Sequence, residues 1–205
     1  MSREPKRRMS AAKRREVIVE SATEVFAERG YDGAPIDEIA RRSGISAPVL
    51  YDHFPSKLAL FQEVLAAEYA RLRAAWQVTF AAPEPLRQRF AAALDAWFAH
   101  VEQRRKSIPV LFQVATADEG ARQAQVDATR ASRAALAPFV TDVLASAESE
   151  VDELDTEMLI EIIAASLRAL ALWWHDHPAV PRVRLVDAAL DALWPAVERR
   201  LPPSS

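Results

Sequence analysis

The segment from residue 36 to residue 61 constrains the fold most, because two short helical patterns meet there at a glycine. An apolar i, i+3, i+4 stripe that begins at Ile36 predicts a helix of about two turns. Gly44 follows it, where a left-handed backbone conformation can end a helix and turn the chain. Ser46 is suited to cap a second helix, which should end near His53. Helix, glycine turn and capped helix predict a helix-turn-helix, whose second helix lies in the major groove of DNA.

The composition favours an all-α protein. Half of the 205 residues are hydrophobic, and the chain has only four glycines and no cysteine. The lack of cysteine excludes disulfides and thiolate metal sites, and it fits a reducing cytoplasm. We see no apolar run near the roughly 18 residues that cross a bilayer, and the basic N-terminus has no apolar segment behind it. We therefore expect a cytoplasmic protein with no membrane partner.

Apolar residues recur at helical spacing on both sides of the glycine turn. A first helix at 10–29, ended by Gly30, would pack behind the helix-turn-helix and complete a three-helix domain over residues 10–60. A helix that Ser56 caps would run from Lys57 to about Phe80, from the DNA face into the next domain. Further helices are predicted at residues 85–105, 119–147 (kinked at Pro138), 155–175 and 184–201, with a short apolar piece at 107–116 and an acidic loop at 148–155.

Residues at fixed spacing across the first segment resemble the DNA-binding domain of the tetracycline-repressor (TetR) family, over about residues 14–73. They are Ile39, Ala40, Gly44, Ile45, Ser46, Leu50, Tyr51, His53, Phe54, Ser56, Lys57 and Leu60. The resemblance implies an N-terminal DNA-binding domain and a helical domain over residues 61–205 that binds a ligand and forms a dimer. It also implies that the last two helices form the dimer interface.

The second helix of the turn supplies the expected DNA contacts. In a helix-turn-helix its N-terminal residues reach base edges while their neighbours hold phosphates. The resemblance assigns Tyr51, His53 and Lys57 to the DNA backbone. With the residues selected by their position on the helix, the candidates are Ser46, Ala47, Pro48, Val49, Tyr51, His53 and Lys57. The alternative for Tyr51 is packing against Phe54 and Leu58. Because Ala47 and Val49 replace polar residues common in the family, we expect sparse hydrogen-bonded readout and contact with thymine methyl groups.

Charge is distributed unevenly along the chain. Residues 1–60 carry 11 cationic and 9 acidic side chains, whereas the other 145 carry 15 and 20. Residues 1–9 are predicted to be a disordered basic arm. Its cations are expected either to touch phosphates beside the main site or to act as a solubilising tail; they are Arg3, Lys6, Arg7 and Arg8. A basic end on an acidic body suits a protein that presents one face to a polyanion.

The helix predicted at 155–175 is apolar over most of its circumference, and such a helix is buried nearly all round. A small domain cannot wrap it alone, so a second copy of the chain is the expected cover. The last helix adds a second apolar surface. The candidate dimer residues are Met158, Leu159, Ile162, Ile163, Leu167, Leu170, Trp174, Leu190, Leu193, Trp194 and Val197.

Aromatic residues from several helices of the C-terminal domain are candidates for a ligand pocket. The alternative is that they fill an ordinary core. With three possible polar anchors, the candidates are Tyr69, Trp76, Phe80, Phe90, Trp97, Phe98, His100, Phe112, Gln113, Thr116, Phe139 and Trp173. Because the body is acidic and the candidates are mostly apolar, the expected effector is a small apolar molecule, uncharged or cationic.

No arrangement typical of a catalytic site stands out in the sequence. The run His175-Asp176-His177 lacks further ligands, so a solvated helix end fits it better than a metal site. We expect no enzyme, cofactor or metal. The expected function is a ligand-responsive transcriptional regulator, a repressor, that binds a palindromic operator as a homodimer. The alternative is an effector-independent architectural DNA-binding or protein-interaction module on the same fold; an all-helical enzyme has no residues to support it.

Overall fold

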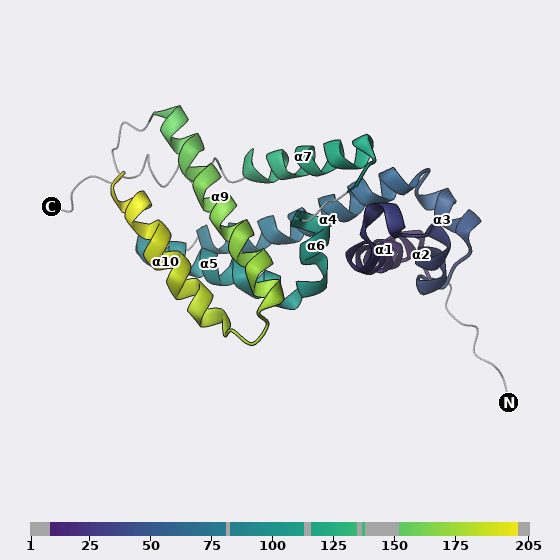
Figure 1. The fold of residues 1–205 in the computed structure, drawn as a ribbon, viewed down its shortest axis with the longest axis horizontal. Coiled ribbons are helices and arrows are strands. Elements are labelled where there is room, and N and C mark those ends of the chain that lie inside the picture. The colour runs from purple at the N-terminus through teal and green to yellow at the C-terminus, as the bar shows by residue number, and fades with distance from the viewer. Residues whose placement is uncertain (1–8, 81–82, 113–115, 135–136, 138–151, 201–205) are drawn as a thin grey trace.

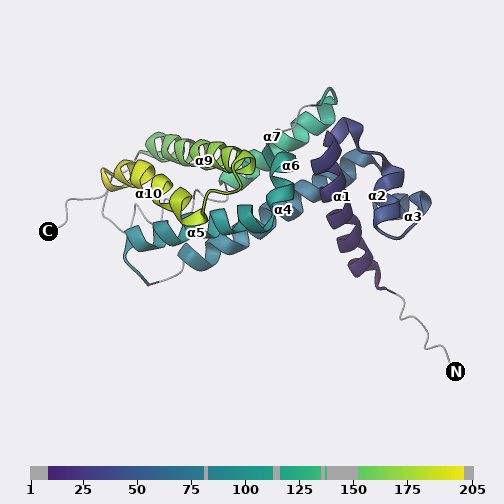
Figure 2. The same ribbon diagram turned by 60° about the horizontal axis from the view of Figure 1, so that its bottom comes forward.

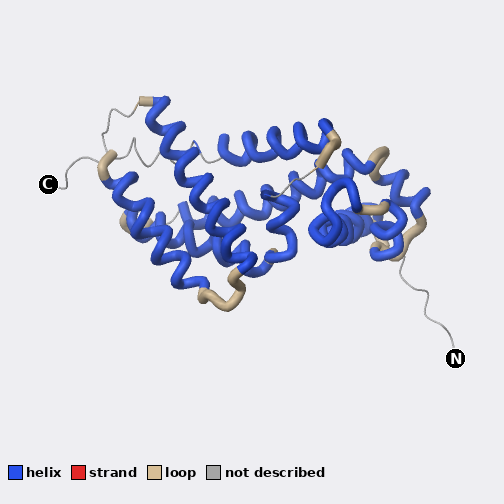
Figure 3. Tube along the Cα trace, in the orientation of Figure 1, coloured by secondary structure: helices blue, strands red, loops and turns tan. Residues whose placement is uncertain are grey.

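The computed structural model describes residues 9–80, 83–112, 116–134, 137 and 152–200, and within them every regular element is helical (Figures 1 and 3). The predicted all-α fold class is therefore confirmed. In chain order the elements are α1 (Ala11–Gly33), α2 (Ile36–Arg42), α3 (Ala47–His53), α4 (Lys57–Phe80), α5 (Leu86–Gln103), the 3-10 helix η1 (Arg105–Ser107), α6 (Ile108–Phe112), α7 (Glu119–Ala134), α9 (Glu153–Asp176) and α10 (Arg182–Glu198).

The head of the molecule comprises α1, α2, α3 and the start of α4. Its buried core includes Ile18 and Phe26 of α1, Ile39 of α2, Leu50 of α3 and Leu60 of α4, each at most 3% exposed. Because these side chains come from all four helices, their burial fixes α3 against the other three. The outer face of α3 is left at one end of the molecule, far from α10 (Figures 1 and 2).

Two glycines turn the chain where the sequence predicts. Gly30 and Gly44 both have φ of +69°, a left-handed conformation that other residues rarely adopt. α1 continues for one turn beyond the bend at Gly30, so it ends at Gly33 and is longer than predicted.

Helix capping departs from expectation at one position. Ser56 caps α4 as expected, since the backbone N–H of Ala59 donates to its Oγ at 3.0 Å. Ser46 lies at the N-cap of α3, but its side chain makes no capping hydrogen bond. Pro48 occupies the second helical position and has no N–H, which removes one of the two usual donors to such a cap.

α4 belongs to both parts of the molecule. Its 24 residues span about 36 Å. Its first turn lies in the head, whereas Tyr69, Leu72 and Trp76 are buried in the body formed by α5, α6, α7, α9 and α10. α5 packs along α4, and α10 packs along α5 (Figure 2).

Some boundaries in the body differ from the predicted ones. The predicted helix at 85–105 ends at Gln103, and Pro109 lies in the first turn of a separate short helix, α6. α9 begins at Glu153, inside the predicted acidic loop, because the Asp152 carboxylate accepts the N–H of Leu154 at 3.3 Å. α10 begins two residues earlier than predicted, directly after Pro181. The predicted kink at Pro138 lies outside the described residues.

The segment Leu154–Asp176 of α9 is long and apolar enough to cross a membrane. The prediction that no segment would qualify is wrong. In this fold the helix packs against its own chain through Leu159, Leu167 and Trp174, whereas other apolar residues along it stay exposed.

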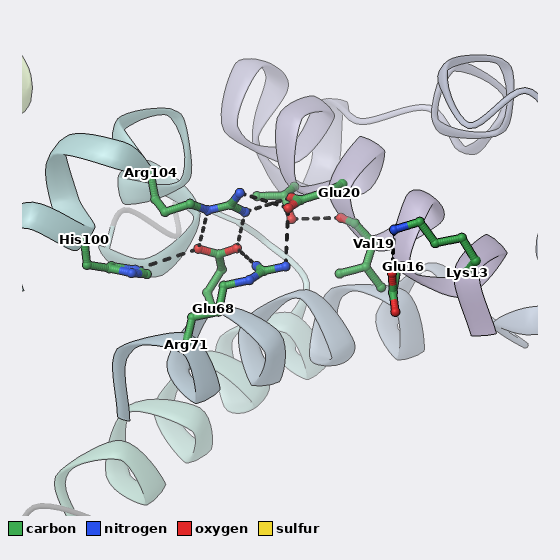
Figure 4. Close-up of polar contacts among 9 residues, drawn as sticks. Lys13, Glu16, Val19, Glu20, Glu68, Arg71, His100 and Arg104 are labelled. Carbon is green, nitrogen blue, oxygen red and sulfur yellow. Dashed lines mark hydrogen bonds and ion pairs between the residues drawn. The ribbon is translucent and has the colours of Figure 1, made fainter. Parts of the chain in front are cut away.

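A network of charged side chains around the buried Glu68 joins the head to the body (Figure 4). The Glu68 side chain on α4 is fully buried and pairs with Arg71 and with Arg104, whose Nη2 is 2.5 Å from the carboxylate. Arg104 also holds Glu20 of α1 at 2.8 Å, and this hydrogen bond keeps the pKa of Glu20 below its ordinary value. His100 Nε2 lies 4.0 Å from Glu68, and burial lowers the pKa of His100. Buried charges are tolerated only when paired, so this network fixes how α1 lies against α5.

Arg104→Ala should destabilise the chain by about 3 kcal/mol, because it leaves the buried Glu68 with one cation instead of two. Urea unfolding at neutral pH measures the loss. Arg122→Ala is the matched control, since it breaks only an exposed pair with Glu119 and should cost less than about 1 kcal/mol. Equal effects of the two substitutions would contradict the role given to the network.

The same variant has an expected pH dependence. The pKa of Glu20 is lowered in the folded state, so its contribution is present above its ordinary pKa of 4.5 and is lost as pH falls through the lowered value. Arg104→Ala removes the main cause of that shift. The stability difference between wild type and variant should therefore shrink as the pH is taken below about 4 in the unfolding series.

Candidate nucleic-acid interface and regulatory cavity

The outer face of α3 carries most of the candidate DNA contacts. Leu50 anchors the helix in the core, and Ser46, Pro48 and Tyr51 face outward. Tyr51 is 49% exposed, so it is not a core residue of this chain. The exposed part of its side chain is available to a partner, and packing against Phe54 and Leu58 stays the alternative for the covered part.

Three further candidates on α3 are half-buried, namely Ala47, Val49 and His53. The His53 carbonyl accepts Arg15 Nη1 at 3.1 Å, and the Arg15 guanidinium lies 4.2 Å from the centroid of the Phe54 ring. Arg15 also pairs with Glu63 at 2.8 Å. Arg15 therefore braces the end of α3 against α1 and α4.

Lys57 is engaged by its own chain. Its ammonium donates to the carbonyl oxygen of Asp32 at 3.2 Å and lies 4.9 Å from the centroid of the Tyr31 ring. Burial lowers the pKa of Lys57, and the carboxylates of Asp32 and Asp118 oppose that shift. A DNA phosphate would have to compete with these partners for the ammonium group. Nothing in the sequence around Lys57 indicates that it has partners within the chain.

Arg41 is a candidate contact that the sequence reasoning missed. It lies in the last turn of α2 with a side chain 74% exposed, and its nearest described carboxylate, on Glu38, is 3.8 Å away. The first helix of a helix-turn-helix crosses the DNA backbone. The place of Arg41 on that helix could therefore have identified it from the sequence as a candidate contact. Its neighbour Arg42 is held by Glu28 and Glu38, both at 2.6 Å. The predicted basic arm lies outside the described residues, apart from Met9.

A cavity of about 110 Å³ lies in the body between α4, α5, α7, α9 and α10. Five of the predicted pocket residues line it, Tyr69, Trp76, Phe90, Trp97 and Phe112. The Trp76 and Trp97 rings stack at 5.7 Å, and the Phe112 ring lies 5.9 Å from Trp97. These rings give the cavity an apolar wall.

One edge of the cavity is polar and positively charged. Tyr69 Oη and Thr129 Oγ1 are 3.2 Å apart, and the only charged side chains among the described lining residues are Arg133 and Arg168. Arg133 pairs with Glu161 at 2.7 Å, and Arg168 donates to the carbonyl of Phe112 at 3.0 Å. Burial raises the pKa of Tyr69, and the two arginines act against that shift. The expectation of an uncharged or cationic effector did not include these two cations.

Four predicted pocket residues lie elsewhere. Phe98 is fully buried and packs edge-on against Trp174 at 6.0 Å, and His100 belongs to the Glu68 network. Thr116 bonds Asp32 in the head. Trp173 is 45% exposed and stacks on His177 at 4.1 Å. Helical spacing does not distinguish the cavity wall from the rest of the core. The Phe80 side chain, Gln113 and Phe139 lie outside the described residues.

The predicted dimer residues differ in burial, and they fall into a buried, a half-buried and an exposed group. Five are buried within the chain, and they are Leu159, Leu167, Trp174, Leu193 and Val197. Leu159, Leu167 and Val197 line the cavity instead, as does the half-buried Ile163. Leu170, Leu190 and Trp194 are also half-buried, and Trp194 lies 6.1 Å from Phe90. A helix with two apolar faces packs one of them inward, and the sequence alone cannot say which.

The outward face of α9 carries the remaining apolar side chains. Met158 and Ile162 are 45% and 51% exposed, and they are joined by Leu154 and Trp173, which are not among the predicted dimer residues. Among the described residues, no group of three or more histidine or acidic side chains is placed to hold a metal ion. His177 instead places Nδ1 2.8 Å from the Trp173 carbonyl oxygen.

Solved structures share this fold. A TetR-like transcriptional regulator from Rhodococcus sp. RHA1 superposes with a TM-score of 0.71 at 27% identity, covering 94% of this chain and 97% of that one. FadR from Bacillus subtilis, solved in complex with stearoyl-CoA, has a TM-score of 0.75 at 17% identity and covers 87% of this chain and 96% of its own. At that identity FadR supports the fold alone.

Relatives and family profiles agree on the class of protein. The transcriptional activator FasR of Mycolicibacterium smegmatis is 29% identical over 188 residues, 91% of this chain and 84% of that protein. The repressor BepR of Brucella suis is 34% identical over 111 residues, 50% of this chain and 51% of that protein. The profile of bacterial regulatory proteins of the tetR family matches residues 18–64, and that of the tetracyclin repressor-like C-terminal domain matches residues 86–196. With more than half of its length matched, this chain belongs to the TetR family of DNA-binding transcriptional regulators.

Proposed function

We propose that this chain is a ligand-responsive transcriptional regulator of the cytoplasm that binds a palindromic operator as a homodimer. Each protomer would place α3 in a major groove, with half-sites about one helical turn, or roughly 34–36 Å, or a multiple apart. The observation that carries the proposal is the arrangement of α4, which supports α3 at one end and forms a wall of the cavity farther along. No catalytic role is proposed, since the fold and the relatives are those of regulators.

The exposed apolar face of α9 supports the homodimer. Leu154, Met158, Ile162 and Trp173 are each at least 45% exposed on one helix. Apolar side chains gathered in this way mark interaction surfaces in proteins that fold in water. α10 lies beside α9 (Figure 2), so the two helices can form a four-helix interface with those of a second copy.

The cavity supports an amphipathic effector with an anionic head. Its rings and aliphatic side chains suit a hydrocarbon chain, and Arg133 and Arg168 supply the positive charge at its polar edge. Arginine recognises carboxylate and phosphate through paired hydrogen bonds. The stearoyl-CoA complex of FadR, which shares the fold, supports a long-chain acyl thioester as the first compound to test.

The cavity also supports the ligand-responsive function over the architectural alternative left open by the sequence. An effector-independent architectural module has no use for a lined cavity next to the helix that carries its DNA-reading head. Whether the chain represses or activates a gene depends on where its operator lies. A dimer bound over a promoter blocks transcription from that promoter, so we propose repression. The name of FasR indicates that a similar chain can also activate.

DNase I footprinting of the region upstream of the chain's own coding sequence tests the DNA-binding mode. The expected result is two protected half-sites related by a dyad, with centres one or more helical turns apart. Adding stearoyl-CoA should change the protein concentration that gives half protection by about 5- to 150-fold. A single unpaired footprint would contradict the palindromic operator, and a footprint indifferent to stearoyl-CoA and stearate would favour the architectural module.

The charge of the effector can be tested separately by ligand binding. Quenching of the cavity tryptophans, Trp76 and Trp97, reports occupancy by stearoyl-CoA, stearate or octadecanol. Arg133→Gln and Arg168→Gln should each weaken the two anions about tenfold, because each removes a charge-assisted hydrogen bond. Octadecanol should change by less than about twofold.

The matched control for the arginine variants is Arg130→Gln. Arg130 lies one turn before Arg133 on α7, is 73% exposed, pairs with Asp127 and does not line the cavity. It should leave the binding of all three compounds unchanged. If the Arg133 and Arg168 variants weaken octadecanol as much as stearate, the anionic head group is wrong.

The dimer interface is tested by Ile162→Arg. A charge in the middle of the exposed α9 face should convert the dimer into a species of 22.8 kDa, measured by light scattering coupled to gel filtration. Val126→Arg is the control, since Val126 is 49% exposed on α7, and it should leave the dimer intact. A wild-type chain that elutes as a monomer at micromolar concentration would refute the homodimer.

A further inference from the structure

Asp32 holds two parts of the molecule together at the junction of head and body. It lies in the last turn of α1, beyond the bend at Gly30. Its carboxylate accepts the Thr116 hydroxyl at 2.6 Å and the Ala117 N–H at 3.1 Å, both from the connection that precedes α7. These hydrogen bonds, Thr116 first, stabilise the charged carboxylate and lower the pKa of Asp32.

The same residue holds the ammonium group of Lys57. The carbonyl oxygen of Asp32 accepts Lys57 Nζ at 3.2 Å, and the neighbouring Tyr31 ring lies beneath the ammonium at 4.9 Å. The carboxylate adds electrostatic attraction to Lys57. Lys57 opens α4 beside the DNA-reading helix, so a phosphate has to draw this ammonium away from Asp32.

The start of α7 lies directly against this junction. Asp118 caps the helix, since its carboxylate accepts the N–H of Ala121 at 2.8 Å. A Cβ at Gly120 would lie 2.9 Å from Cδ2 of Leu58, so the glycine permits the first turn of α7 to approach the first turn of α4 closely. A shift of α7 would therefore displace the groups that bond Asp32 and the groups that pack beside Lys57.

The other end of α7 forms part of the cavity. Thr129, Ser132 and Arg133 line it, and the 16 residues of α7 span about 24 Å. A second cavity, of about 160 Å³, lies at the junction between Tyr31, Phe61 and Val110. It leaves unfilled space between α1 and α6, so the head can shift against the body there without overpacking.

We infer that Asp32 is a positioning residue that restrains Lys57 from the DNA backbone and ties that restraint to the first turn of α7. One part of the inference, that a bound ligand moves α7, rests on the proposed function. The restraint itself acts without a ligand. DNA binding must break the Lys57–Asp32 contact, so loosening Asp32 strengthens binding, and it does so only through Lys57.

A double-mutant cycle in DNA affinity tests this inference. The full chain is titrated against mixed-sequence duplex DNA by fluorescence anisotropy over a series of salt concentrations. Asp32→Ala keeps the backbone carbonyl that accepts Lys57 but removes the attraction of the carboxylate and its hydrogen bonds to Thr116 and Ala117. It should tighten Kd by about three- to fivefold, the upper part of the range for an exposed charge pair. Lys57→Ala should weaken binding and lower the salt slope by about 0.9 per protomer. In the Lys57→Ala background, Asp32→Ala should change Kd by less than about twofold.

Two further variants separate positioning from general charge and from folding. Asp37→Ala removes an exposed carboxylate of the first turn of α2, and any effect it has should be the same with and without Lys57. Thr116→Val removes the hydroxyl that donates to Asp32 and accepts the N–H of Asp118 at 3.0 Å, whereas Asp32 keeps its charge. Kd should shift in the same direction as in Asp32→Ala. Thermal unfolding verifies that each variant is folded.

Each outcome decides the inference. Non-additivity of Asp32 and Lys57, with Thr116→Val following Asp32→Ala, supports it. An unchanged or weaker Kd in Asp32→Ala overturns it, as does a gain of the same size in the Lys57→Ala background, which would be ordinary charge repulsion. A wild-type chain without affinity for duplex DNA at low salt would instead contradict DNA binding by the family fold.

Discussion

The continuity of α4 is the constraint on which the rest of the structure depends. A helix has no hinge where its backbone hydrogen bonds are unbroken, so the head and body share a rigid element instead of a linker. Glu68 lies midway along it, fully buried between Arg71 and Arg104, and Arg104 reaches Glu20 of α1. Because a buried carboxylate requires its cations, the angle between α1, α4 and α5 is fixed by charge as well as by packing.

The head could be predicted closely because its signals are local. Gly44 and the Ser56 cap each act within a few residues, so they can be recognised in the sequence, and α4 has the predicted bounds. The missing cap at Ser46 was also readable, since Pro48 has no N–H to donate. The Arg104–Glu20 and Asp32–Thr116 contacts join positions 84 residues apart, and no periodicity indicates such pairs.

The body was harder to predict because each apolar helix has more than one face. Trp173 and Trp174 are adjacent in the sequence, yet the first is 45% exposed and the second 1%. Only tertiary packing distinguishes them, since the Trp174 ring packs against Phe98 of α5 and the Arg105 guanidinium of η1. The acidic body likewise suggested a cationic or neutral effector, whereas the cavity carries two arginines. Net charge describes the exposed surface, and the few side chains turned inward set the chemistry of a cavity.

The energies involved indicate how small a ligand-driven change needs to be. Coupling between two sites in regulatory proteins is about 1–3 kcal/mol, the scale of one or two hydrogen bonds to charged groups. Arg133 of α7 pairs with Glu161 of α9, and in the proposed function an anionic head group replaces Glu161 as its partner. That exchange would alter how one end of α7 is held, while the connection before its other end bonds Asp32 through Thr116 and Ala117. Under the proposed function such a regulator would need no large rearrangement, because the free energy of a single exchanged ion pair is on the same scale as the coupling between two sites.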